Sequence, residues 1–396
     1  MKILHIIPSV SPARGGTSTA VLGEVKALNQ QGIEAEILTT NDHGNDLLDV
    51  PFKQKVQFDE VPVWFVPKFS PKINSIREFC FAGEFAPWLE QNIANYDLIE
   101  IHSLFSYTCT RGALISRQKN KPYIINPHGH FLPWVINQKR WKKEIYAFLV
   151  EKSNLHHANG IRCTSLGEVK DVKDFGIKSP TFTIPLGIEK IPDYPDAKIK
   201  LRQKYNIPET TPIILFFSRL HPKKRPDLLL QVLGKIKAEN LPFHLILAGN
   251  GDEEYVHYIE KMCKELGLES QTTFPGLVTE EKALFLRGSD IFVLPSFAEN
   301  FALAVAESMT VGVPVIITPE VQISADISDG NAGLIIPGEL DVWVTGIKQL
   351  LLDRDLREKL GKNAQKLAQE KYSWDNVAKN LISVYNEIIN RPGAKV

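Results

Sequence analysis

The sequence predicts an α/β protein with two Rossmann-like domains, each built on a parallel sheet with helices on both faces. Short apolar runs typical of buried strands alternate along the chain with longer segments of helical periodicity. The length of 396 residues suggests two or so domains, at a rough ~150 residues each. A charged segment from Glu189 to Glu209, punctuated by three prolines, separates two such alternations and predicts the linker between the domains.

The first alternation is assigned to a domain of residues 1–190. It begins with a strand and a turn that contains Gly15 and Gly16, followed by a helix. Paired glycines let a backbone approach a ligand closely, and Thr17 or Ser18 can cap the helix. The strands expected in this domain are 3–8, Ala35–Thr40, Val63–Val66, Leu98–His102, Tyr123–Asn126, Ile161–Thr164 and Thr181–Pro185.

The second alternation is assigned to a domain of residues 191–372. Residues 373–396 form a third segment, in which an amphipathic pattern from Trp374 to Ile389 predicts a helix that crosses back to the first domain. In an open parallel sheet, ligands bind at the carboxyl ends of the strands, so polar residues that follow a strand are the candidates for a site. The elements expected in the second domain are the strands Pro212–Phe217, His244–Ala248, Ile291–Leu294, Val313–Thr318 and Ala332–Ile336 and the helices 339–354 and 355–371.

Composition argues against several classes of function. Lys plus Arg and Asp plus Glu number 46 each, so no overall charge attracts nucleic acid. The cysteines lack C-x-x-C spacing, which argues against a disulfide framework and a zinc site. No apolar stretch approaches the ~20 residues of a membrane span. We therefore expect a cytoplasmic protein, and a location at the inner face of the membrane is the alternative.

Two common nucleotide-binding patterns are incomplete or missing. The stretch Gly249-Asn250-Gly251 follows a predicted strand like half of a dinucleotide fingerprint, but Glu254 occupies the third glycine position. The P-loop pattern G-x-x-x-x-G-K-[ST] does not occur in the sequence. Hydride transfer and P-loop hydrolysis are therefore poorly supported.

The most informative stretch follows the apolar run Ile291–Leu294. A turn leads there into a helix of small residues that starts at about Phe301, so a helix N-terminus lies at the carboxyl edge of a sheet. Unpaired backbone N–H groups and the helix dipole make such an edge an anion site. Glu299 precedes this start, and Glu307 lies among apolar neighbours, where a carboxylate needs hydrogen-bond donors such as sugar hydroxyls. The plainer alternatives are that Glu299 complements the helix dipole and that Glu307 is solvated.

The stretch from Glu299 through Glu307 resembles the E-x7-E motif of the retaining glycosyltransferases of family 4, whose GT-B fold has two Rossmann-like domains facing a central cleft. The resemblance implies that Glu299 binds hydroxyls of the transferred sugar and that Glu307 holds the nucleotide ribose. Many members have glycine where this chain has Ala302, so the alanine is strained if the backbone requires a positive φ. The residues whose backbone it assigns to the donor diphosphate are Asn300, Phe301, Ala302 and Leu303.

The resemblance also assigns two cations and a histidine. Arg219 and Lys224 follow a predicted strand and match the positions that clamp the leaving diphosphate, although Ser218 replaces the usual glycine. A histidine at the end of a strand is, from its position alone, more often a packed residue than a ligand contact. Members of the family place a similar histidine beside the transferred sugar. His128 is therefore the expected sugar contact, with His130 as the weaker candidate.

Further residues are assigned to the nucleotide-sugar site. In the resembled family, the first glycine-rich loop faces the donor phosphates and the acceptor, and a segment like Phe274–Val278 contacts the nucleobase through its backbone. The residues assigned on this basis are Gly15, Gly16, Leu277 and Val278, together with Gly249 at the end of a predicted strand.

The resulting hypothesis is a retaining glycosyltransferase that moves a sugar from a nucleotide-sugar donor to a hydroxyl of a glycan or lipid-linked acceptor in cell-surface polysaccharide synthesis. A UDP-sugar is favoured over a GDP-sugar. Neither a metal nor another cofactor is expected, because Arg219, Lys224 and the helix start supply positive charge to the leaving group. The domains are expected to close on the donor. The alternatives are a GT-B epimerase, a non-catalytic nucleotide-sugar-binding subunit and, least supported, a dehydrogenase.

A helix is also expected over Trp134–Leu155, where the basic cluster 139–143 lies beside an apolar stripe. Such a helix can contact lipid headgroups or an anionic acceptor. Packing of the stripe on the core is the more common arrangement. A peripheral membrane contact is therefore kept as an alternative.

Overall fold

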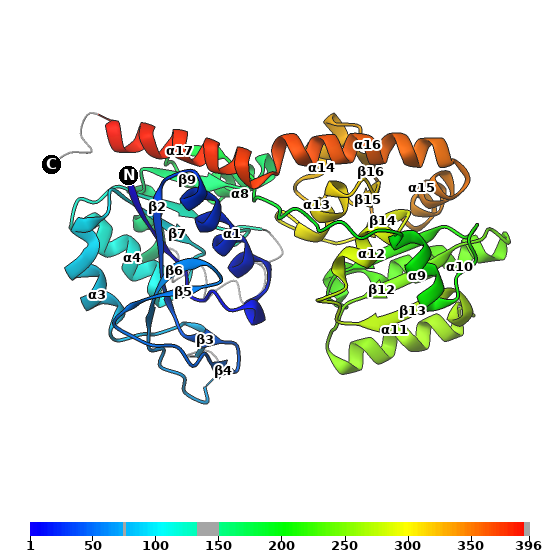
Figure 1. The fold of residues 1–396 in the computed structure, drawn as a ribbon, viewed down its shortest axis with the longest axis horizontal. Coiled ribbons are helices and arrows are strands. Elements are labelled where there is room, and N and C mark those ends of the chain that lie inside the picture. Colours follow the sequence, from blue (N-terminus) through cyan, green and yellow to red (C-terminus); the bar gives the residue numbers. More distant parts are fainter. Residues whose placement is uncertain (74–76, 133–149, 392–396) are drawn as a thin grey trace. The chain divides into compact units, whose positions relative to one another are not determined.

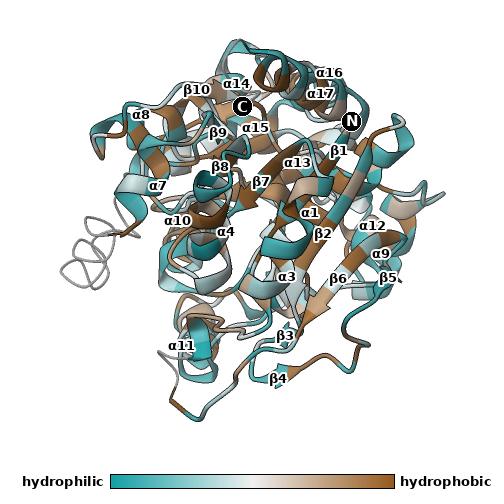
Figure 2. Cartoon of the chain, turned by 90° about the vertical axis from the view of Figure 1, so that its left-hand side faces the viewer, coloured by the Kyte–Doolittle hydropathy of each residue, from teal (hydrophilic) through white to brown (hydrophobic). Residues whose placement is uncertain are grey.

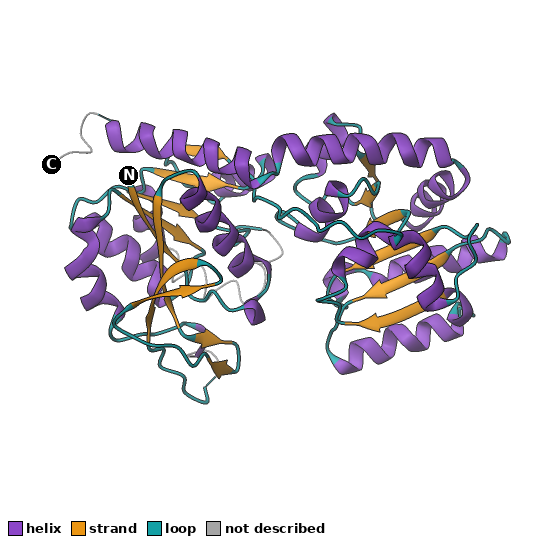
Figure 3. Ribbon diagram, in the orientation of Figure 1, coloured by secondary structure: helices purple, strands orange, loops and turns teal. Residues whose placement is uncertain are grey.

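Residues 1–73, 77–132 and 150–391 are described by a computed structural model (Figure 1). They divide into two units. Unit 1 consists of Met1–Ile188 and Trp374–Val396, and unit 2 consists of Glu189–Ser373. In each unit, helices enclose the strands of a sheet (Figure 3). These boundaries lie close to residues 190 and 372, which the sequence suggested.

Unit 1 is built on an eight-stranded sheet with the order β10-β9-β8-β7-β1-β2-β6-β5. Its strands are β1 Lys2–Ile6, β2 Glu34–Thr40, β5 Lys55–Phe58, β6 Val61–Val66, β7 Leu98–His102, β8 Tyr123–Asn126, β9 Gly160–Cys163 and β10 Thr181–Thr183. Neighbouring strands are parallel except at the edge, where β5 pairs antiparallel with β6. The sequence did not indicate β5 or the short pair β3 (Asp42–His43) and β4 (Asp46–Leu47), because such short strands show too little alternation.

Helices cover both faces of this sheet. They are α1 Gly16–Gln30, α3 Phe85–Asn92, α4 Tyr107–Gln118, α7 Lys152–His156, α8 Leu166–Asp174 and α17 Trp374–Asn390, with 3-10 turns at Pro12–Arg14 and Ile93–Asn95. The sheet strands β6 and β7 are mostly apolar, whereas the helices around them carry polar stretches (Figure 2).

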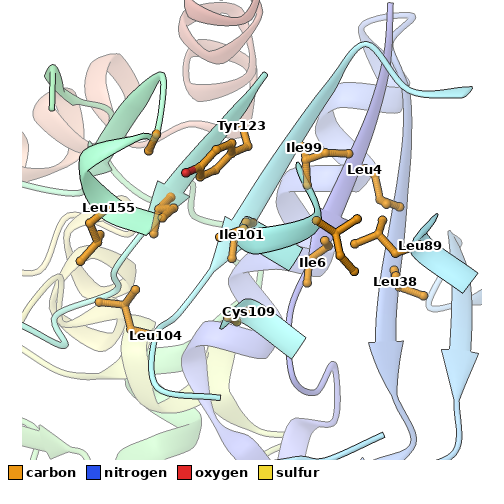
Figure 4. Close-up of a cluster of buried hydrophobic side chains, with 14 of the residues drawn as sticks. Leu4, Ile6, Leu38, Leu89, Ile99, Ile101, Leu104, Cys109, Tyr123 and Leu155 are labelled. Atoms are coloured by element: carbon orange, nitrogen blue, oxygen red, sulfur yellow. The ribbon is translucent and has the colours of Figure 1, made fainter. Parts of the chain in front are cut away.

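Successive side chains of β1 enter two different apolar cores, as the period of two along a strand requires. Leu4 and Ile6 face the core that α3 and α4 cover, where they lie with Ile101 of β7 (Figure 4). Ile3 faces the opposite core, which α1 and α17 cover. His5 follows Leu4 on the strand and therefore shares the face of Ile3.

The helix α17 packs on unit 1 through a tryptophan at its start. Trp374 lies against Gly23 of α1 and against Gly187. A Cβ atom would lie 2.5 Å from the indole ring at Gly23 and 2.1 Å from it at Gly187. Because neither position has room for a side chain, the two glycines make the docking of this helix specific.

Unit 2 contains a six-stranded parallel sheet with the order β13-β12-β11-β14-β15-β16. Its strands are β11 Ile213–Phe217, β12 His244–Ala248, β13 Thr272–Gly276, β14 Ile291–Leu294, β15 Val315–Ile317 and β16 Gly333–Ile335. The sequence analysis did not count β13 among the strands. This strand lies at an edge, is only half-buried and contains Pro275, which agrees with the restriction of proline to edge strands.

The helices of unit 2 include one inside the expected linker. They are α9 Ala197–Tyr205, α10 Pro226–Ala238, α11 Glu253–Glu265, α12 Lys282–Gly288, α13 Leu303–Thr310, α14 Ser324–Asp329, α15 Leu340–Leu352 and α16 Arg354–Lys371, with 3-10 turns at Pro222–Lys224 and Glu269–Gln271.

The prediction that all of Glu189–Glu209 is a linker was therefore wrong. The helix α9 packs on α12, where a Cβ atom at Gly288 would lie 2.6 Å from Leu201, and Arg202 donates to Asp290 at 2.8 Å. Only Ala197 and Leu201 are buried along α9. Two apolar positions are too few to distinguish a helix from a charged linker by periodicity.

The order of the strands reverses at one place in each sheet. In unit 1, β1 has β2 on one side and β7 on the other, and in unit 2, β11 has β12 on one side and β14 on the other. Doubly wound proteins bind ligands outside the carboxyl ends of the strands at such a reversal. The loops that follow β1 and β7 in unit 1, and β11 and β14 in unit 2, are therefore candidate ligand-binding loops.

Candidate active site

In unit 2, the loops that follow β11 and β14 are hydrogen-bonded to each other. The backbone N–H of Phe297 donates to the carbonyl oxygen of Lys223 at 2.8 Å, and Ser296 Oγ donates to the same oxygen at 3.0 Å. These bonds bring Lys224, which follows β11, to Glu299, which follows β14. Two of the predicted site residues thus meet at the strand reversal of unit 2.

Glu299 is a nearly buried carboxylate whose donors all lie on one oxygen. Its Oε1 pairs with Lys224 Nζ, accepts from Ser296 Oγ at 2.9 Å and lies 3.9 Å from Lys223 Nζ. The side chain is 12% exposed. Within the described residues, Oε2 accepts no hydrogen bond. The carboxylate is thus fixed in orientation while one oxygen stays available to a ligand donor.

The loop after β11 has an excess of positive charge. Arg219 is exposed, and its guanidinium makes no hydrogen bond or ion pair with the residues that the structure describes. Lys223 is half-buried, and burial lowers the pKa of its amine, although Glu299 opposes this effect. Lys224 completes the group. Three cations and one carboxylate leave a net positive site that suits an anion.

The helix after Glu299 begins later than expected. Helix α13 starts at Leu303 rather than at Phe301, because Ala302 has φ 55° and ψ 68°, in the left-handed region. An alanine is strained in this conformation, whereas glycine is not. No side chain of the described residues caps α13, so its first backbone N–H groups can bind an anion.

The residues on either side of Ala302 differ in their surroundings. Phe301 is buried, and its ring packs edge-on against Tyr372 with the centroids 5.1 Å apart. Leu303 is half-buried. The Oδ1 atom of Asn300 is buried and has no hydrogen-bond partner in the described parts of the chain. A buried oxygen without a hydrogen-bond partner needs an explanation, and a hydrogen bond from a ligand donor would provide one.

Glu307 lies on α13 and forms an ion pair with Lys282 of α12. The two side chains are 15% and 34% exposed, respectively. The sequence analysis reasoned that Glu307 needed donors from a ligand because its sequence neighbours are apolar. That reasoning was incomplete, since a lysine that is distant in sequence supplies one donor.

Gly249 is explained by the close approach of two loops. It has φ 152°, and a Cβ atom there would lie 1.9 Å from the carbonyl oxygen of Ser218. Its N–H donates to the carbonyl oxygen of Gly276 at 2.8 Å. The loops after β11, β12 and β13 are thereby held together. Leu277, which is 64% exposed, and the half-buried Val278 follow directly.

Unit 1 contains a cavity of about 390 Å³ at its own strand reversal. Arg14 lies in its wall and donates to Asp42 from Nε at 2.5 Å and from Nη2 at 2.8 Å, and to Glu78 from Nη1 at 2.7 Å. Its charge is therefore already balanced by two carboxylates. Thr17 and His130 also line this cavity.

The paired glycines form the start of α1. Gly15 has φ 87° and occupies the cap position, and Gly16 is the first helical residue. The expectation that Thr17 or Ser18 caps this helix was wrong, because Ser18 Oγ instead donates to the carbonyl oxygen of Ser9 at 2.8 Å. Like α13, α1 therefore starts without a side-chain cap from the described residues.

The two candidate histidines have different environments. His130 Nδ1 lies 2.6 Å from the carbonyl oxygen of Pro127, and its Nε2 lies 3.4 Å from Ser103 Oγ. His128, which has φ 50°, is half-buried, and its Nε2 lies 3.1 Å from His102 Nδ1. Both histidines belong to unit 1, whereas the cations and acids predicted for the donor belong to unit 2.

His102 connects His128 to a group of buried ionisable side chains, which we call the buried cluster. Arg162 Nη1 donates to Glu24 Oε2 at 2.5 Å and to Glu100 Oε1 at 2.9 Å. The hydroxyl of Tyr385 donates to the other oxygen of Glu100. The members of the cluster, which come from β1, α1, β7, β9 and α17, are His5, Glu24, Glu100, His102, Arg162 and Tyr385.

Burial shifts the pKa values of several members of the buried cluster toward the uncharged form. Burial raises the pKa of Glu24 to about 8, although Arg162 opposes this effect. Burial also lowers the pKa of His5 to about 4 and that of His102 well below its ordinary value. At neutral pH, Glu24, His5 and His102 are therefore uncharged, and the guanidinium of Arg162 contacts Glu24 and Glu100.

Several residues that shape the site were missed at the level of sequence. Lys282 and the carbonyl group of Lys223 carry no local signal, because their partners are far away in the chain. Glu168 accepts from the N–H of Gly129 at 2.5 Å and from that of Thr164 at 2.7 Å, so it fixes the turn before His130. The cluster did leave a signal: His5, Glu100 and Arg162 each interrupt an apolar strand, where ionisable residues are rare.

The basic cluster 139–143 lies outside the described residues. None of the helices within 1–73, 77–132 and 150–391 combines the length and the hydropathy that a membrane crossing requires.

Two family models match the chain. Residues 14–190 match a family model described as Glycosyltransferase Family 4, and residues 197–367 match one described as Glycosyl transferases group 1. The two matches cover most of the chain, with one in each unit. The chain belongs to the family 4 glycosyltransferases.

This glycosyltransferase is similar to one relative over about half of its length and to another over nearly all of it. It is 32% identical over 193 residues to an uncharacterized glycosyltransferase from Methanocaldococcus jannaschii, a match that covers 48% of each chain. It is 24% identical to a D-inositol 3-phosphate glycosyltransferase from Corynebacterium glutamicum over 98% of this chain and 96% of the relative. The chain thus spans about half the length of the first relative and nearly all of the second.

The glycosyltransferase also resembles the crystal structure of Anabaena HepE in complex with UDP-glucose. The TM-score is 0.76 and the sequence identity 20%, over 98% of this chain and 100% of that chain. A likeness at this low identity concerns the fold, which is GT-B.

Replacing Ala302 by glycine tests the strain at the start of α13. The Ala302→Gly variant should be as stable as the wild type or more stable by up to about 1 kcal/mol, because relief of the left-handed strain offsets the entropy of the added glycine. Ala304→Gly, on the same helix, is the control and should lose about 1 kcal/mol. Denaturant unfolding measures both. Equal losses in the two variants would show that Ala302 is not strained.

Replacing Glu24 by glutamine tests the buried proton. The folded protein holds this proton up to a pKa of about 8, whereas the reference pKa of a glutamate is 4.5. The wild type should therefore lose stability relative to Glu24→Gln as the pH rises from about 4.5 to 8, by at most ~1.4 kcal/mol per pH unit. Above pH 8 the difference should be constant. A difference in unfolding midpoint that does not vary with pH would contradict the raised pKa.

Proposed function

We propose that this family 4 glycosyltransferase transfers a sugar from a nucleotide-sugar donor to an acceptor hydroxyl with retention of the anomeric configuration. The observation that carries the proposal is the position of the Lys224–Glu299 ion pair. It lies at the strand reversal of unit 2, in the loop that leads into the uncapped start of α13. One site therefore offers groups for a diphosphate and for a polyol.

The leaving diphosphate is bound by positive charge that is fixed before the reaction. Arg219 has no internal partner among the described residues, and Lys224 can exchange Glu299 for a phosphate oxygen. The first N–H groups of α13 add backbone donors. Donors that stabilise a developing oxyanion in this way contribute ~10²–10³ in rate each, so the chain itself can support departure of the diphosphate without a metal ion.

The two acids bind the two polyol parts of the donor. Glu299 orients the transferred sugar through its Oε2 atom, which is available for a hydroxyl. Glu307, paired with Lys282, holds the ribose. Leu277 and Val278 contact the base through their backbone groups. The shape of the loop, rather than their side chains, therefore determines which base is bound. A UDP-sugar is favoured over a GDP-sugar, and the named complex of HepE with UDP-glucose supports this preference.

The attack on the sugar takes place on the face from which the diphosphate leaves. Neither Glu299 nor Glu307 serves as a nucleophile in this scheme, because both are engaged with cations and with hydroxyl groups of the donor. The pattern of two carboxylates astride the scissile bond, typical of glycosidases, therefore fits poorly. The leaving phosphate accepts the proton of the acceptor hydroxyl, and His128 contacts a hydroxyl of the transferred sugar.

The acceptor is a glycan or a lipid-linked glycan of a cell-surface polysaccharide. The cavity of unit 1 provides polar walls for such a molecule. The basic cluster 139–143 would bring the enzyme to the inner face of the membrane, where a lipid-linked acceptor is located.

Nucleotide release from UDP-, GDP- and ADP-sugars, with and without glycan, lipid-linked and inositol phosphate acceptors, tests the proposal. Release that requires an acceptor, with a product of the donor's anomeric configuration, supports it. Isomerised sugar formed without an acceptor would favour an epimerase. Tight nucleotide-sugar binding without transfer to any acceptor would favour a non-catalytic subunit, and a product of inverted configuration would refute the retaining mechanism.

The two acids should respond differently to truncation. Glu299→Ala should lower kcat by ~10²–10³, because the transferred sugar loses its orientation. Glu307→Ala should mainly weaken binding of the nucleotide, by about tenfold in Kd. Calorimetric titration with the nucleotide and steady-state kinetics measure the two effects. Glu358→Ala, an exposed acid on α16, is the control, and equal activity in all three variants would refute both roles.

Chelation tests the metal-independent clamp. Addition of EDTA should leave the transfer rate unchanged, because Arg219, Lys224 and the start of α13 neutralise the leaving group. Loss of transfer in EDTA that Mg²⁺ restores would contradict this expectation. Arg219→Ala should remain inactive with or without Mg²⁺.

A further inference from the structure

Three histidines of unit 1 form a hydrogen-bonded chain that runs from the core to His128. His5 Nδ1 and His102 Nε2 are 2.9 Å apart, and His102 Nδ1 and His128 Nε2 are 3.1 Å apart. The rings are stacked, with centroids separated by 5.2 Å and 5.3 Å. His5 and His102 are fully buried. The last atom of the chain, Nδ1 of His128, has no hydrogen-bond partner among the described residues.

Such a chain can have only one polarity at a time. A neutral imidazole donates from one nitrogen and accepts at the other. If His5 carries its hydrogen on Nδ1, then His102 must accept at Nε2 and donate from Nδ1. His128 must then accept at Nε2 and carry its own hydrogen on Nδ1.

One observation selects this outward polarity. The Nε2 atom of His5 is buried without a partner in the described part of the structure, and an unpaired buried N–H is more costly than an unpaired acceptor. The hydrogen of His5 therefore belongs on Nδ1.

The buried cluster holds the inner end of the chain in place. Arg162 bonds both Glu24 and Glu100, and Tyr385 bonds Glu100. Ligand atoms of His5, Glu24, Glu100 and His102 lie within 4.8 Å of one another, which is close enough to surround a metal ion. The fixed positive charge of Arg162 against both carboxylates disfavours a cation, so we assign the cluster an orienting role.

We propose that His5 and His102 are positioning residues that keep His128 in its neutral tautomer with the proton on Nδ1. In this tautomer, His128 presents an N–H donor to an oxygen of the transferred sugar. The inference rests on the proposed function only in that His128 contacts this sugar. A donor of this kind strengthens the hold on one sugar oxygen without adding charge to the site.

The groups that face His128 agree with a neutral ring. Burial lowers the pKa of His128 well below its ordinary value, and His102, Arg162 and His130 act in the same direction. Glu100 opposes them. His128 should therefore keep its hydrogen on Nδ1, without gaining a second proton, throughout the range from pH 6 to pH 8.

Nitrogen NMR of the wild-type protein, labelled with ¹⁵N-histidine and free of substrate, reads the tautomer directly. The His128 signals are assigned by their loss in His128→Ala. Their chemical shifts should be those of a protonated Nδ1 and an unprotonated Nε2 and should not change between pH 6 and pH 8. A bare Nδ1, or a titration near the ordinary pKa of 6.5, would overturn the inference. This measurement needs neither activity nor a core substitution.

Breaking the chain in the core provides a second test. His102→Phe and His5→Phe should let His128 populate both tautomers and should lower kcat about tenfold, the equivalent of one hydrogen bond, with KM for the donor unchanged. Tyr96→Phe is the matched control. It removes a buried hydrogen bond of 2.7 Å to Glu36 in the same unit but has no link to His128, so the His128 signals and kcat should be those of the wild type.

The two tests separate the inference from the proposed function. If no sugar is transferred by the wild type, the proposed function fails, while the wild-type spectrum still decides the tautomer of His128. If transfer occurs and His102→Phe changes neither the His128 signals nor kcat, the positioning role is wrong. Should His102→Phe fail to fold, the wild-type spectrum and His5→Phe decide.

Discussion

The ion pair between Lys224 and Glu299 connects two loops that leave neighbouring strands of unit 2. Its formation depends on the strand order, which sets β14 beside β11, and on the carbonyl group of Lys223, which binds the backbone N–H of Phe297. A nearly buried carboxylate without this lysine would be an unbalanced charge, which is costly. The rest of the donor site is arranged around this constraint. Under the proposed function, a ligand takes over both partners at once, because phosphate oxygens would replace Glu299 at the lysine while hydroxyls would satisfy the carboxylate.

The two units use charge in different ways. In unit 2, Arg219 is exposed and has no partner among the described residues, so its charge is available to a ligand. In unit 1, Arg162 is fully buried and forms a salt bridge with Glu100. A buried charge that is satisfied internally cannot bind a ligand, but it can fix the geometry of its neighbours. Under the proposals made above, Arg219 therefore belongs to the binding surface and Arg162 to the support of His128.

The sequence predicted the order of most strands because their apolar runs are short and bounded by polar residues. It also predicted which loops carry Arg219, Lys224 and Glu299, because parallel strands bring their carboxyl ends to one edge. The helix α9 was not recognised, since too few of its residues are buried to give a period. The start of α13 was placed early, because the left-handed conformation of Ala302 delays the first helical residue to Leu303. Partners such as Lys282 could not be predicted, since the contact requires the tertiary arrangement of α12 and α13.

The insertion of unit 2 between two parts of unit 1 has a consequence for synthesis on the ribosome. The strands of unit 1 are complete before Glu189 emerges, but α17 begins only at Trp374. At roughly 5–20 residues per second, translation of the intervening segment takes on the order of 10–40 s. Throughout that interval, the apolar face around Ile3 is covered by α1 but not by α17, and Glu100 lacks the hydroxyl of Tyr385. The nascent first unit therefore exposes part of its apolar surface until α17 has been synthesised.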